Sequence, residues 1–412
     1  MEPSQERPRP RREPRSRTGP GSTRRGALAA IGGGLTAALA GCVDALETSV
    51  DDPFAVETVV DGLAHPWAMA IVPGDSRLLV TEREGRLSLV DREGGSHTEV
   101  DGAPVVYVTG QGGLLDVALH PDFPDDPRVY LTYSIANDDG ESTTAVGRAR
   151  LEADDGDDPE LTDGTELYVA EPWLDSSGHF GSRAVFGPDD RLYVSVGDRR
   201  EDGFDAEHVS QDRSNDLGTT LRLEPDGSIP DDNPFVDDED AVDAIYTYGH
   251  RNAQGMTVHP ETDELWQSEH GEEDGDELNV LEAGSNYGWP IAHYGCAYGT
   301  DEPIGDEPAD RDDVVDPVYY WKCGSGGFPP AGMTFYDGDT FPEWQGDLLV
   351  GNLAGQYLGR FSVDGTDVSE KDRLLEGRGW RIRDVVVAPD TGDVYVAVDD
   401  GDAPIVRLTP QE

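Results

Sequence analysis

The chain of 412 residues contains 85 acidic and 31 basic residues, which gives a formal net charge of −54 at pH 7. So acidic a surface would repel nucleic-acid phosphates and therefore argues against a nucleic-acid-binding protein. Regular apolar runs and seven tryptophans argue against disorder. Because salt screens self-repulsion of this size, we expect a protein from a halophilic source.

The first 41 residues differ from the rest, with eight arginines and three acidic residues. Arg24 and Arg25 precede a short apolar run, and residues 39–42 read Leu-Ala-Gly-Cys. This order is typical of a twin-arginine (Tat) lipoprotein signal peptide at 1–41. A membrane-spanning anchor is the alternative, but residues 27–41 are short for one. We expect Cys42 to carry a lipid and residues 42–55 to form a tether that holds the exported protein at the outer face of the cell membrane.

The three cysteines are Cys42, Cys296 and Cys323. If Cys42 is lipidated, the other two remain as a pair. Outside the cell, conditions are oxidising, which favours a Cys296–Cys323 disulfide over two unpaired thiols in loops.

From residue 56 onward, short runs of β-forming residues alternate with Asp, Gly and Pro turns. Several runs share one pattern: an apolar strand, a His-Pro or Gly-Pro-Asp turn, a Leu-Tyr-Val run and then Gly-Asp. Such recurrence every several tens of residues is typical of β-propeller blades, although spacing alone does not choose six blades over seven. We predict an all-β propeller over residues 56–412, with strands that include 77–82, 86–90, 128–133, 191–196, 220–224, 347–352 and 393–398.

Two acidic stretches, residues 151–165 and 300–316, contain glycine and proline but no apolar pattern. Blade-like units continue on both sides of each stretch. We therefore predict surface loops at these positions and no domain boundary.

Residues 246–290 bring together chemically different polar groups. Arg251 and the amides Asn252 and Gln254 come before His270-Gly271, which opens a run of carboxylates. Carboxylates and glycine turns that present backbone carbonyls supply the hard oxygen ligands that calcium prefers. Acidic runs in such an acidic chain are usually solvated, but the mixed chemistry of the whole stretch favours a functional site.

Three further segments carry unusual polar groups. Gln111 lies on a glycine turn, His179 lies between glycines, and Arg381 and Arg383 are two residues apart, hence on one face of a strand. Taken singly, such a histidine is more often structural, and the arginines could pair with surface acids. Together with residues 246–290, they suit an anionic, oxygen-rich ligand whose carboxylates the arginines bind.

On these motifs, the chain resembles the soluble quinoprotein glucose and aldose sugar dehydrogenases, which use pyrroloquinoline quinone (PQQ) and calcium. The resemblance implies a six-bladed β-propeller of four-stranded antiparallel blades and places the chain in the compact aldose branch. It covers nearly the whole mature chain in order, through residues 65–73, 110–123, 178–186, 191–199, 221–235, 246–290, 329–336 and 378–387.

The resemblance also implies a role for each matching residue. His179 would be the base that takes the proton of the sugar's C1 hydroxyl, and Arg251 would stabilise the charge that develops on the quinone. The other positions that it assigns are Gln111, Asn252, Arg381 and Arg383 for PQQ, Gly271 and Glu272 for a pocket calcium through their backbone carbonyls, and Glu277 and Tyr287 for a second, structural calcium.

The sequence departs from the family pattern at three positions. Gly178 replaces an aspartate that orients the base in the glucose branch, so another group or a water molecule must orient His179. Ala354 stands where a cofactor-binding lysine is expected. Glu272 replaces a proline, a change that a backbone calcium ligand tolerates.

We therefore expect a PQQ-dependent aldose dehydrogenase that oxidises sugars at C1 to the lactone. Its expected partners are an aldose and an electron acceptor of unassigned identity, and a homodimer is left open. The alternatives are a non-catalytic propeller that binds a glycan or a protein, favoured by Ala354, and a calcium-dependent lactonase, which would require a metal cage of Asp, Glu and Asn in the channel. The retained His179, Arg251, Arg381 and Arg383 favour the dehydrogenase.

Overall fold

The computed structural model describes residues 53–153 and 158–411 of the chain. The predicted signal peptide, Cys42 and all but the last residues of the predicted tether lie outside this part. The propeller begins at Phe54, two residues before the predicted boundary, because Phe54 and Ala55 already pair with the last strand. Within the described residues, no helix has the length and apolar character needed to span a membrane.

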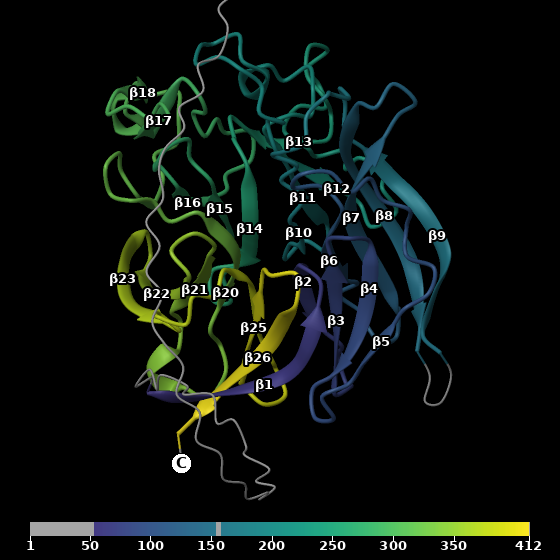
Figure 1. Ribbon diagram of the computed structural model, residues 1–412. Helices are drawn as coiled ribbons and strands as arrows, with labels where there is room; N and C mark the ends of the chain where they lie inside the picture. The colour runs from purple at the N-terminus through teal and green to yellow at the C-terminus, as the bar shows by residue number, and fades with distance from the viewer. Residues whose placement is uncertain (1–52, 154–157, 412) are drawn as a thin grey trace, which may run out of the picture. The chain divides into compact units, whose positions relative to one another are not determined.

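The described chain forms six four-stranded antiparallel sheets, as predicted (Figure 1). We call them blades 1 to 6 in chain order. Blade 1 consists of β2 (Pro66–Ile71), β3 (Arg77–Glu82), β4 (Arg86–Asp91) and β5 (His97–Glu99). Blade 2 consists of β6 (Leu114–Leu119), β7 (Arg128–Ala136), β8 (Ser142–Glu152) and β9 (Glu160–Val169). Blade 3 consists of β10 (Ala184–Phe186), β11 (Leu192–Val196), β12 (Thr219–Leu223) and β13 (Ile245–Tyr248).

Blades 4 to 6 follow the same plan, with their strands again paired in antiparallel order. Blade 4 consists of β14 (Ala253–Val258), β15 (Leu265–Glu269), β16 (Glu277–Val280) and β19 (Tyr319–Tyr320). Blade 5 consists of β20 (Pro330–Phe335), β21 (Leu348–Asn352), β22 (Tyr357–Asp364) and β23 (Asp367–Leu374). Blade 6 consists of β24 (Ile382–Val387), β25 (Val394–Val398), β26 (Ala403–Pro410) and β1 (Phe54–Leu63). Short 3₁₀ helices lie at η1 (Val209–Gln211), η2 (Pro308–Asp310) and η3 (Pro342–Trp344).

The first strand of each blade lies innermost, and these strands contact one another around a ring: β2, β6, β10, β14, β20, β24 and β2 again. The ring is closed by β1, whose register on β26 runs from Phe54 opposite Pro410 to Leu63 opposite Ala403. Figure 1 shows this junction, where purple β1 lies against yellow β26. The two ends of the described chain thus complete one sheet.

Apolar side chains between the blades form the core. The second strand of a blade is buried on both faces, as in β11 and β25, where every residue is buried. This explains the nearly continuous apolar runs Leu-Tyr-Val-Ser-Val and Val-Tyr-Val-Ala-Val. The predicted strands there differ from the observed ones by one residue.

The prediction of loops at 151–165 and 300–316 is wrong in part. Residues 151–152 belong to β8 and residues 160–165 to β9, while the second stretch contains β18 (Pro303–Gly305) and η2. β9 is the outermost strand of its blade and is largely exposed. A strand with solvent around most of its side chains has no apolar alternation, so its sequence looks like a loop.

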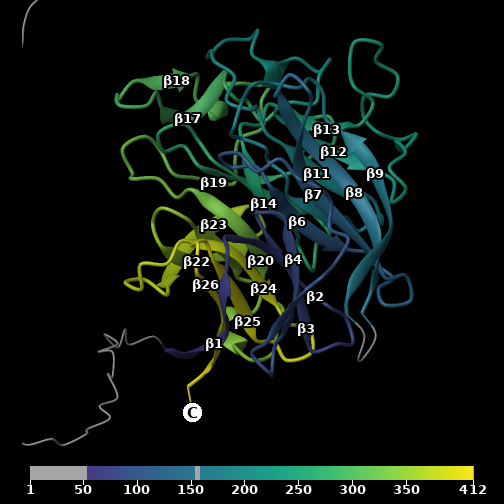
Figure 2. The same cartoon turned by 45° about the vertical axis from the view of Figure 1, so that its right-hand side comes forward.

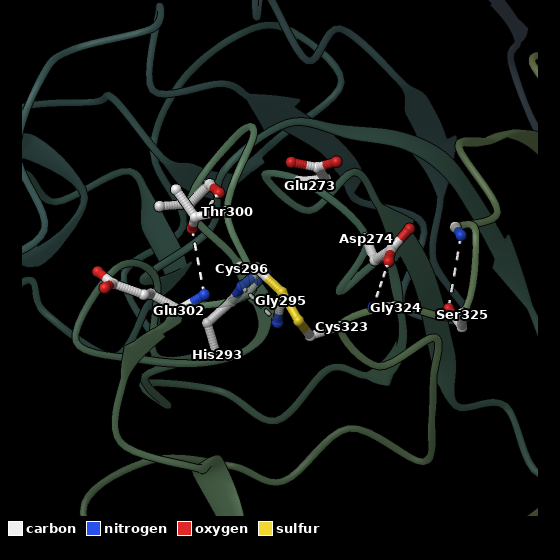
Figure 3. The surroundings of a disulfide bond; sticks show 12 residues. Glu273, Asp274, His293, Gly295, Cys296, Thr300, Glu302, Cys323, Gly324 and Ser325 are labelled. Atoms are coloured by element: carbon white, nitrogen blue, oxygen red, sulfur yellow. Dashed lines mark hydrogen bonds between the residues drawn. A yellow bond between two sulfur atoms is a disulfide. The ribbon is translucent and has the colours of Figure 1, made fainter.

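A small hairpin of β17 (Ala292–Cys296) and β18 forms a separate two-stranded sheet after β16, away from the blades in both ribbon views (Figure 2). Cys296 at the end of β17 forms a disulfide with Cys323, and their Cα atoms are 5.4 Å apart (Figure 3). The favoured pairing of these two cysteines is thereby confirmed. Glu273 and Cys296 also exchange two backbone hydrogen bonds of 3.0 Å, so the hairpin is attached to the loop after β15.

Candidate active site

His179 lies in the loop that leads into β10. Its backbone has a positive φ of 49°, and the glycine at position 181, with φ of 64°, has no room for a side chain because the backbone of residues 195–197 is too close. The backbone N–H of His179 donates to Oε1 of Gln111 at 2.7 Å. Gln111 therefore holds the histidine loop of blade 3 from the glycine turn before blade 2.

Asp198, just after β11, orients the His179 ring. Nδ1 of His179 lies 2.7 Å from Oδ1 of Asp198. Since a carboxylate only accepts, Nδ1 carries the proton and Nε2 has its lone pair free. Asp198 is itself fixed, because its Oδ2 accepts the Trp289 indole N–H at 2.8 Å and its Oδ1 the backbone N–H of Arg200 at 2.9 Å. Asp198 thus orients the His179 ring, a role that Gly178 has no side chain to perform.

Burial determines the protonation of this pair. Burial lowers the pKa of His179 below its ordinary value, against the opposing effect of the Asp198 hydrogen bond. For Asp198, burial alone would raise the pKa, but the hydrogen bond to His179 and the nearby positive charge of Arg251 outweigh it, so the pKa is lowered. The pair is therefore a neutral imidazole beside a carboxylate at neutral pH, which is the state of a general base.

Arg251, between β13 and β14, is buried close to His179. Its guanidinium forms an ion pair with Glu272 at 2.5 Å and lies 5.1 Å from the centre of the Trp289 ring. Its backbone N–H donates to Oε2 of Glu269 at 2.8 Å. The Nε atom of Arg251 is buried and has no hydrogen-bond partner in the described part of the chain. One donor is therefore left for a ligand.

These groups line a cavity of about 370 Å³, which we call the first cavity. Two arginines and four carboxylates face it, and the aromatic side chains Phe204, Trp289 and Tyr298 form part of its wall. A polar cavity without excess positive charge fits a neutral, hydroxyl-rich molecule. Its lining consists of His179, Asp198, Arg200, Glu201, Asp202, Gly203, Phe204, Arg251, Glu272, Trp289 and Tyr298.

A second cavity of about 210 Å³ has the opposite charge balance. Arg381 and Arg383 both contact Oδ2 of Asp399, at 3.3 and 3.0 Å, and Arg383 also donates to Gln254 at 2.9 Å. Burial alone would raise the pKa of Asp399, but the charge of Arg383 outweighs it and holds the pKa well below its usual range. The lining consists of Trp67, Arg83, Gln111, Gln254, His270, Pro329, Leu353, Ala354, Arg381, Arg383 and Asp399.

Two hydrogen bonds join residues of the first cavity's lining to residues of the second cavity's lining. Gln111 lines the second cavity and accepts from the backbone of His179, which lines the first. Arg251 lines the first cavity and donates to the carbonyl of His270, whose side chain lines the second, at 3.4 Å. The two cavities are therefore neighbours in the propeller.

Comparison with known proteins identifies the family. The model of the glucose/sorbosone dehydrogenase family matches residues 63–407. The chain belongs to the glucose/sorbosone dehydrogenase family. It is 39% identical over 359 residues to aldose sugar dehydrogenase YliI of Escherichia coli (strain K12), a match that covers 86% of this chain and 93% of the relative.

Solved structures agree with this family assignment. The apo form of the soluble aldose sugar dehydrogenase of Escherichia coli superposes with a TM-score of 0.79 at 38% identity, over 87% of this chain and all of the other. The PQQ-bound aldose sugar dehydrogenase of Streptomyces coelicolor gives 0.70 at 30% identity, over 86% and 98%. The predictions of family, six-bladed fold and a sugar dehydrogenase enzyme are confirmed.

In this glucose/sorbosone dehydrogenase, the predicted site residues fall into three groups. His179, Arg251 and Glu272 line the first cavity, and Gln111, Arg381 and Arg383 line the second. Asn252 lines neither; its side chain accepts the backbone N–H of Gly181 at 3.2 Å and supports the His179 loop from beneath.

Gly271 begins the tight turn 271–276 after β15. A Cβ atom at Gly271 would lie 2.0 Å from the Asp274 carbonyl oxygen, so the turn requires glycine there. Its N–H donates to Asp276 at 3.0 Å. In the described residues, no group of three His, Cys, Asp or Glu side chains is arranged to hold a metal ion, so a pocket calcium would depend on backbone oxygens.

Glu277 and Tyr287 lie deep in blade 4, apart from both cavities. Burial and then the charge of Glu269 raise the pKa of Glu277 well above its ordinary value. Oε1 of Glu277 and Oδ1 of Asn279 are buried acceptors without a partner in the described part of the chain. These oxygens fit a hard cation. The Tyr287 hydroxyl donates to the Val280 carbonyl and accepts the backbone N–H of Glu282, both at 2.7 Å, so the backbone carbonyl of Tyr287 is the group that would bind a cation.

The second cavity fits the quinone cofactor of the family. Nε2 of His270 and Nε of Arg383 are buried there without a hydrogen-bond partner in the described part of the chain. Three arginines and one carboxylate line it, although the chain as a whole has a net charge of −54. The unsatisfied Arg383 donor and the excess positive charge are what a polycarboxylate requires.

Sequence reasoning missed Asp198, Trp289 and Asp399 as parts of the site. A signal was present for both aspartates, since each follows the apolar run of the second strand of a blade. Trp289 lies in the recognised stretch 246–290, but nothing in the sequence shows that its indole reaches Asp198.

Proposed function

We propose that this protein oxidises aldose sugars at C1 to the lactone and uses PQQ and calcium. The observation that carries the proposal is the neutral His179 held by Asp198 in a cavity that adjoins a second, arginine-lined cavity. The PQQ-bound structure of the Streptomyces coelicolor relative supports the choice of cofactor.

In this proposal, Nε2 of His179 takes the proton of the C1 hydroxyl. Asp198 fixes the tautomer and stabilises the imidazolium that forms, and the low pKa of His179 keeps its lone pair free at neutral pH. PQQ, when bound, would supply the acceptor for a hydride, so that loss of the hydroxyl proton and of the hydride with its two electrons would convert C1 into the lactone carbonyl. The guanidinium of Arg251, fixed by Glu272, lies where it can stabilise developing negative charge.

The remaining assignments follow the chemistry of each group. Gln111, Arg381 and Arg383 would hold the cofactor from the second cavity, and Asn252 would act by supporting the base loop. Backbone carbonyls of Gly271 and Glu272 would bind a pocket calcium, which acts as a Lewis acid. Glu277 and the backbone carbonyl of Tyr287 would bind a second calcium.

We also propose that the protein is exported and held at the outer face of the membrane by a lipid on Cys42. The supporting feature is the Arg24-Arg25 pair followed by Leu-Ala-Gly-Cys at 39–42. Cys42→Ser is expected to release the protein from the membrane fraction or to block its maturation. Membrane association that persists in this variant and yields only to detergent would instead indicate a peptide anchor.

The test of the proposed function is reconstitution of the full chain with PQQ and calcium in high salt, followed by dye reduction over a panel of aldoses. We expect reduction with at least one aldose and none without PQQ. The variant His179→Gln should retain PQQ and lose about 10²–10⁴-fold in kcat. No reduction with any sugar, together with no quinone absorbance on the protein, would refute the proposal.

A further inference from the structure

Almost every arginine in the described part of this acidic chain has a protein partner for its guanidinium. Most form ion pairs with carboxylates, and Arg199 is bonded to the carbonyls of Ser142, Ser176 and Gly178. Among residues 53–153 and 158–411, Arg83 and Arg200 are the two whose guanidinium has no hydrogen bond, ion pair or ring contact. Arg83 lines the second cavity and Arg200 the first.

Arg83 is held by its backbone, while its side chain has no protein partner. It follows β3 directly; its N–H donates to the His65 carbonyl, and its own carbonyl accepts from Leu114, both at 3.1 Å. A Cβ atom at Gly113 would lie 2.9 Å from Cγ of Arg83 and even closer to its carbonyl oxygen. Gly113 therefore leaves room for the Arg83 stem, which is half-buried at the cavity wall.

The arginines that line the second cavity differ in whether a carboxylate of the protein balances their charge. Arg381 and Arg383 share one carboxylate, Asp399, which also contacts Nδ1 of His65 at 2.9 Å. Arg83 has no such counter-charge, although the chain contains 85 acidic residues. On the same wall, Ala354 contributes no polar group. An unpaired guanidinium in a cavity is suited to bidentate binding of a ligand carboxylate.

We propose that Arg83 binds a carboxylate of the quinone cofactor and supplies the positive charge that Ala354 does not provide. This inference rests on the proposed function, since it takes PQQ as the ligand. Arg381 and Arg383 would bind the cofactor while remaining partly neutralised by Asp399. Arg83 is then the cofactor-binding arginine whose full charge is available to PQQ.

The test is direct PQQ binding by the full chain, measured by calorimetry at fixed salt and calcium without any sugar. Arg83→Gln should weaken PQQ binding by about 10- to 100-fold, the loss expected for one charge-assisted contact. Arg83→Lys should recover part of the affinity, because charge remains while the planar fork is lost. Arg150→Gln, on the outer part of blade 2, is the control and should leave the affinity unchanged.

Moving the positive charge from residue 83 to residue 354 distinguishes a direct contact with PQQ from a general weakening of the cavity. In Arg83→Gln, the additional change Ala354→Lys should restore most of the lost affinity. Melting curves without ligand show whether each variant is folded. Wild-type affinity in folded Arg83→Gln would overturn the inference and leave the proposed function intact, whereas absence of PQQ binding by the wild-type protein would overturn both.

Discussion

Nδ1 of His179 lies 2.7 Å from Oδ1 of Asp198, and the same arrangement recurs at His65 and Asp399, which are 2.9 Å apart. Both histidines have φ of 49°, and both precede the innermost strand of a blade. The two pairs differ in origin, because His179 and Asp198 both belong to blade 3, whereas His65 precedes blade 1 and Asp399 belongs to blade 6. The first pair lines the proposed reaction site, whereas the second contributes its carboxylate to the arginines of the second cavity.

Asp198→Asn is expected to lower kcat for aldose oxidation by about 10²-fold or more. An amide can present its N–H to Nδ1 and turn the ring to the wrong tautomer, and it removes the charge that stabilises the imidazolium. Steady-state dye reduction checks this, with PQQ binding measured separately. In the double variant with His179→Gln, the two losses should not add, because both act on one proton transfer. Fully additive losses would show that Asp198 acts through another residue.

The pH profile of kcat/KM should have its acid limb below pH 6.5. The base must be neutral to accept a proton, and burial lowers the pKa of His179, so activity persists through the ordinary histidine range and falls only at lower pH. Profiles of the PQQ- and calcium-loaded enzyme at constant ionic strength provide the measurement. A midpoint at or above 6.5 would contradict a desolvated neutral base at His179.

Removal of the disulfide by Cys296→Ser together with Cys323→Ser should reduce the free energy of unfolding by about 3–4 kcal/mol. The bond closes a loop with a sequence separation of 27, which restricts the unfolded chain. Denaturant titration measures the change, and wild-type protein under reductant should behave like the double variant. Equal stability of the oxidised wild type and the variant would mean that backbone bonds such as those between Glu273 and Cys296 hold the hairpin without the disulfide.

Chelation of calcium should weaken PQQ binding by about 5- to 150-fold, the usual range for two coupled ligands. We expect this because the proposed calcium ligands at 271–272 lie in the turn that pairs Glu272 with Arg251. By reciprocity, PQQ must raise calcium affinity by the same factor. Calorimetric titrations with each ligand in the presence and absence of the other provide the check. Identical PQQ affinities would exclude a metal shared by protein and cofactor.

The fold was predictable because the buried inner strands of the blades are marked by apolar residues in the sequence. β3 and β11 are almost wholly buried strands with apolar residues at their centres, and their predicted bounds agree with the structure within one residue. β9 was missed because outermost strands carry no such pattern. Ring closure by β1 was also not predicted, since nothing local in residues 54–63 specifies a partner near residue 410.

The site was predictable where a motif marks a residue and hidden where a contact crosses blades. His179 and Arg251 stand out by their glycine and aromatic neighbours. Asp198 is one of many Gly-Asp pairs in an acidic chain, and only the fold brings Trp289 within hydrogen-bonding distance of it. Arg83 carries no sequence signal at all, because its distinguishing property is the absence of a partner.

The junction between β1 and β26 also has a consequence for the order of assembly. The second cavity lies between blade 1 and blade 6, the sheet that this junction completes, because Arg83 belongs to blade 1 and Arg383 to blade 6. During translation, β1 has no partner until residues 403–410 have left the ribosome. We therefore expect PQQ to bind only after synthesis is complete and then to hold blades 1 and 6 together. Loss of the cofactor would first weaken the pairing of β1 with β26.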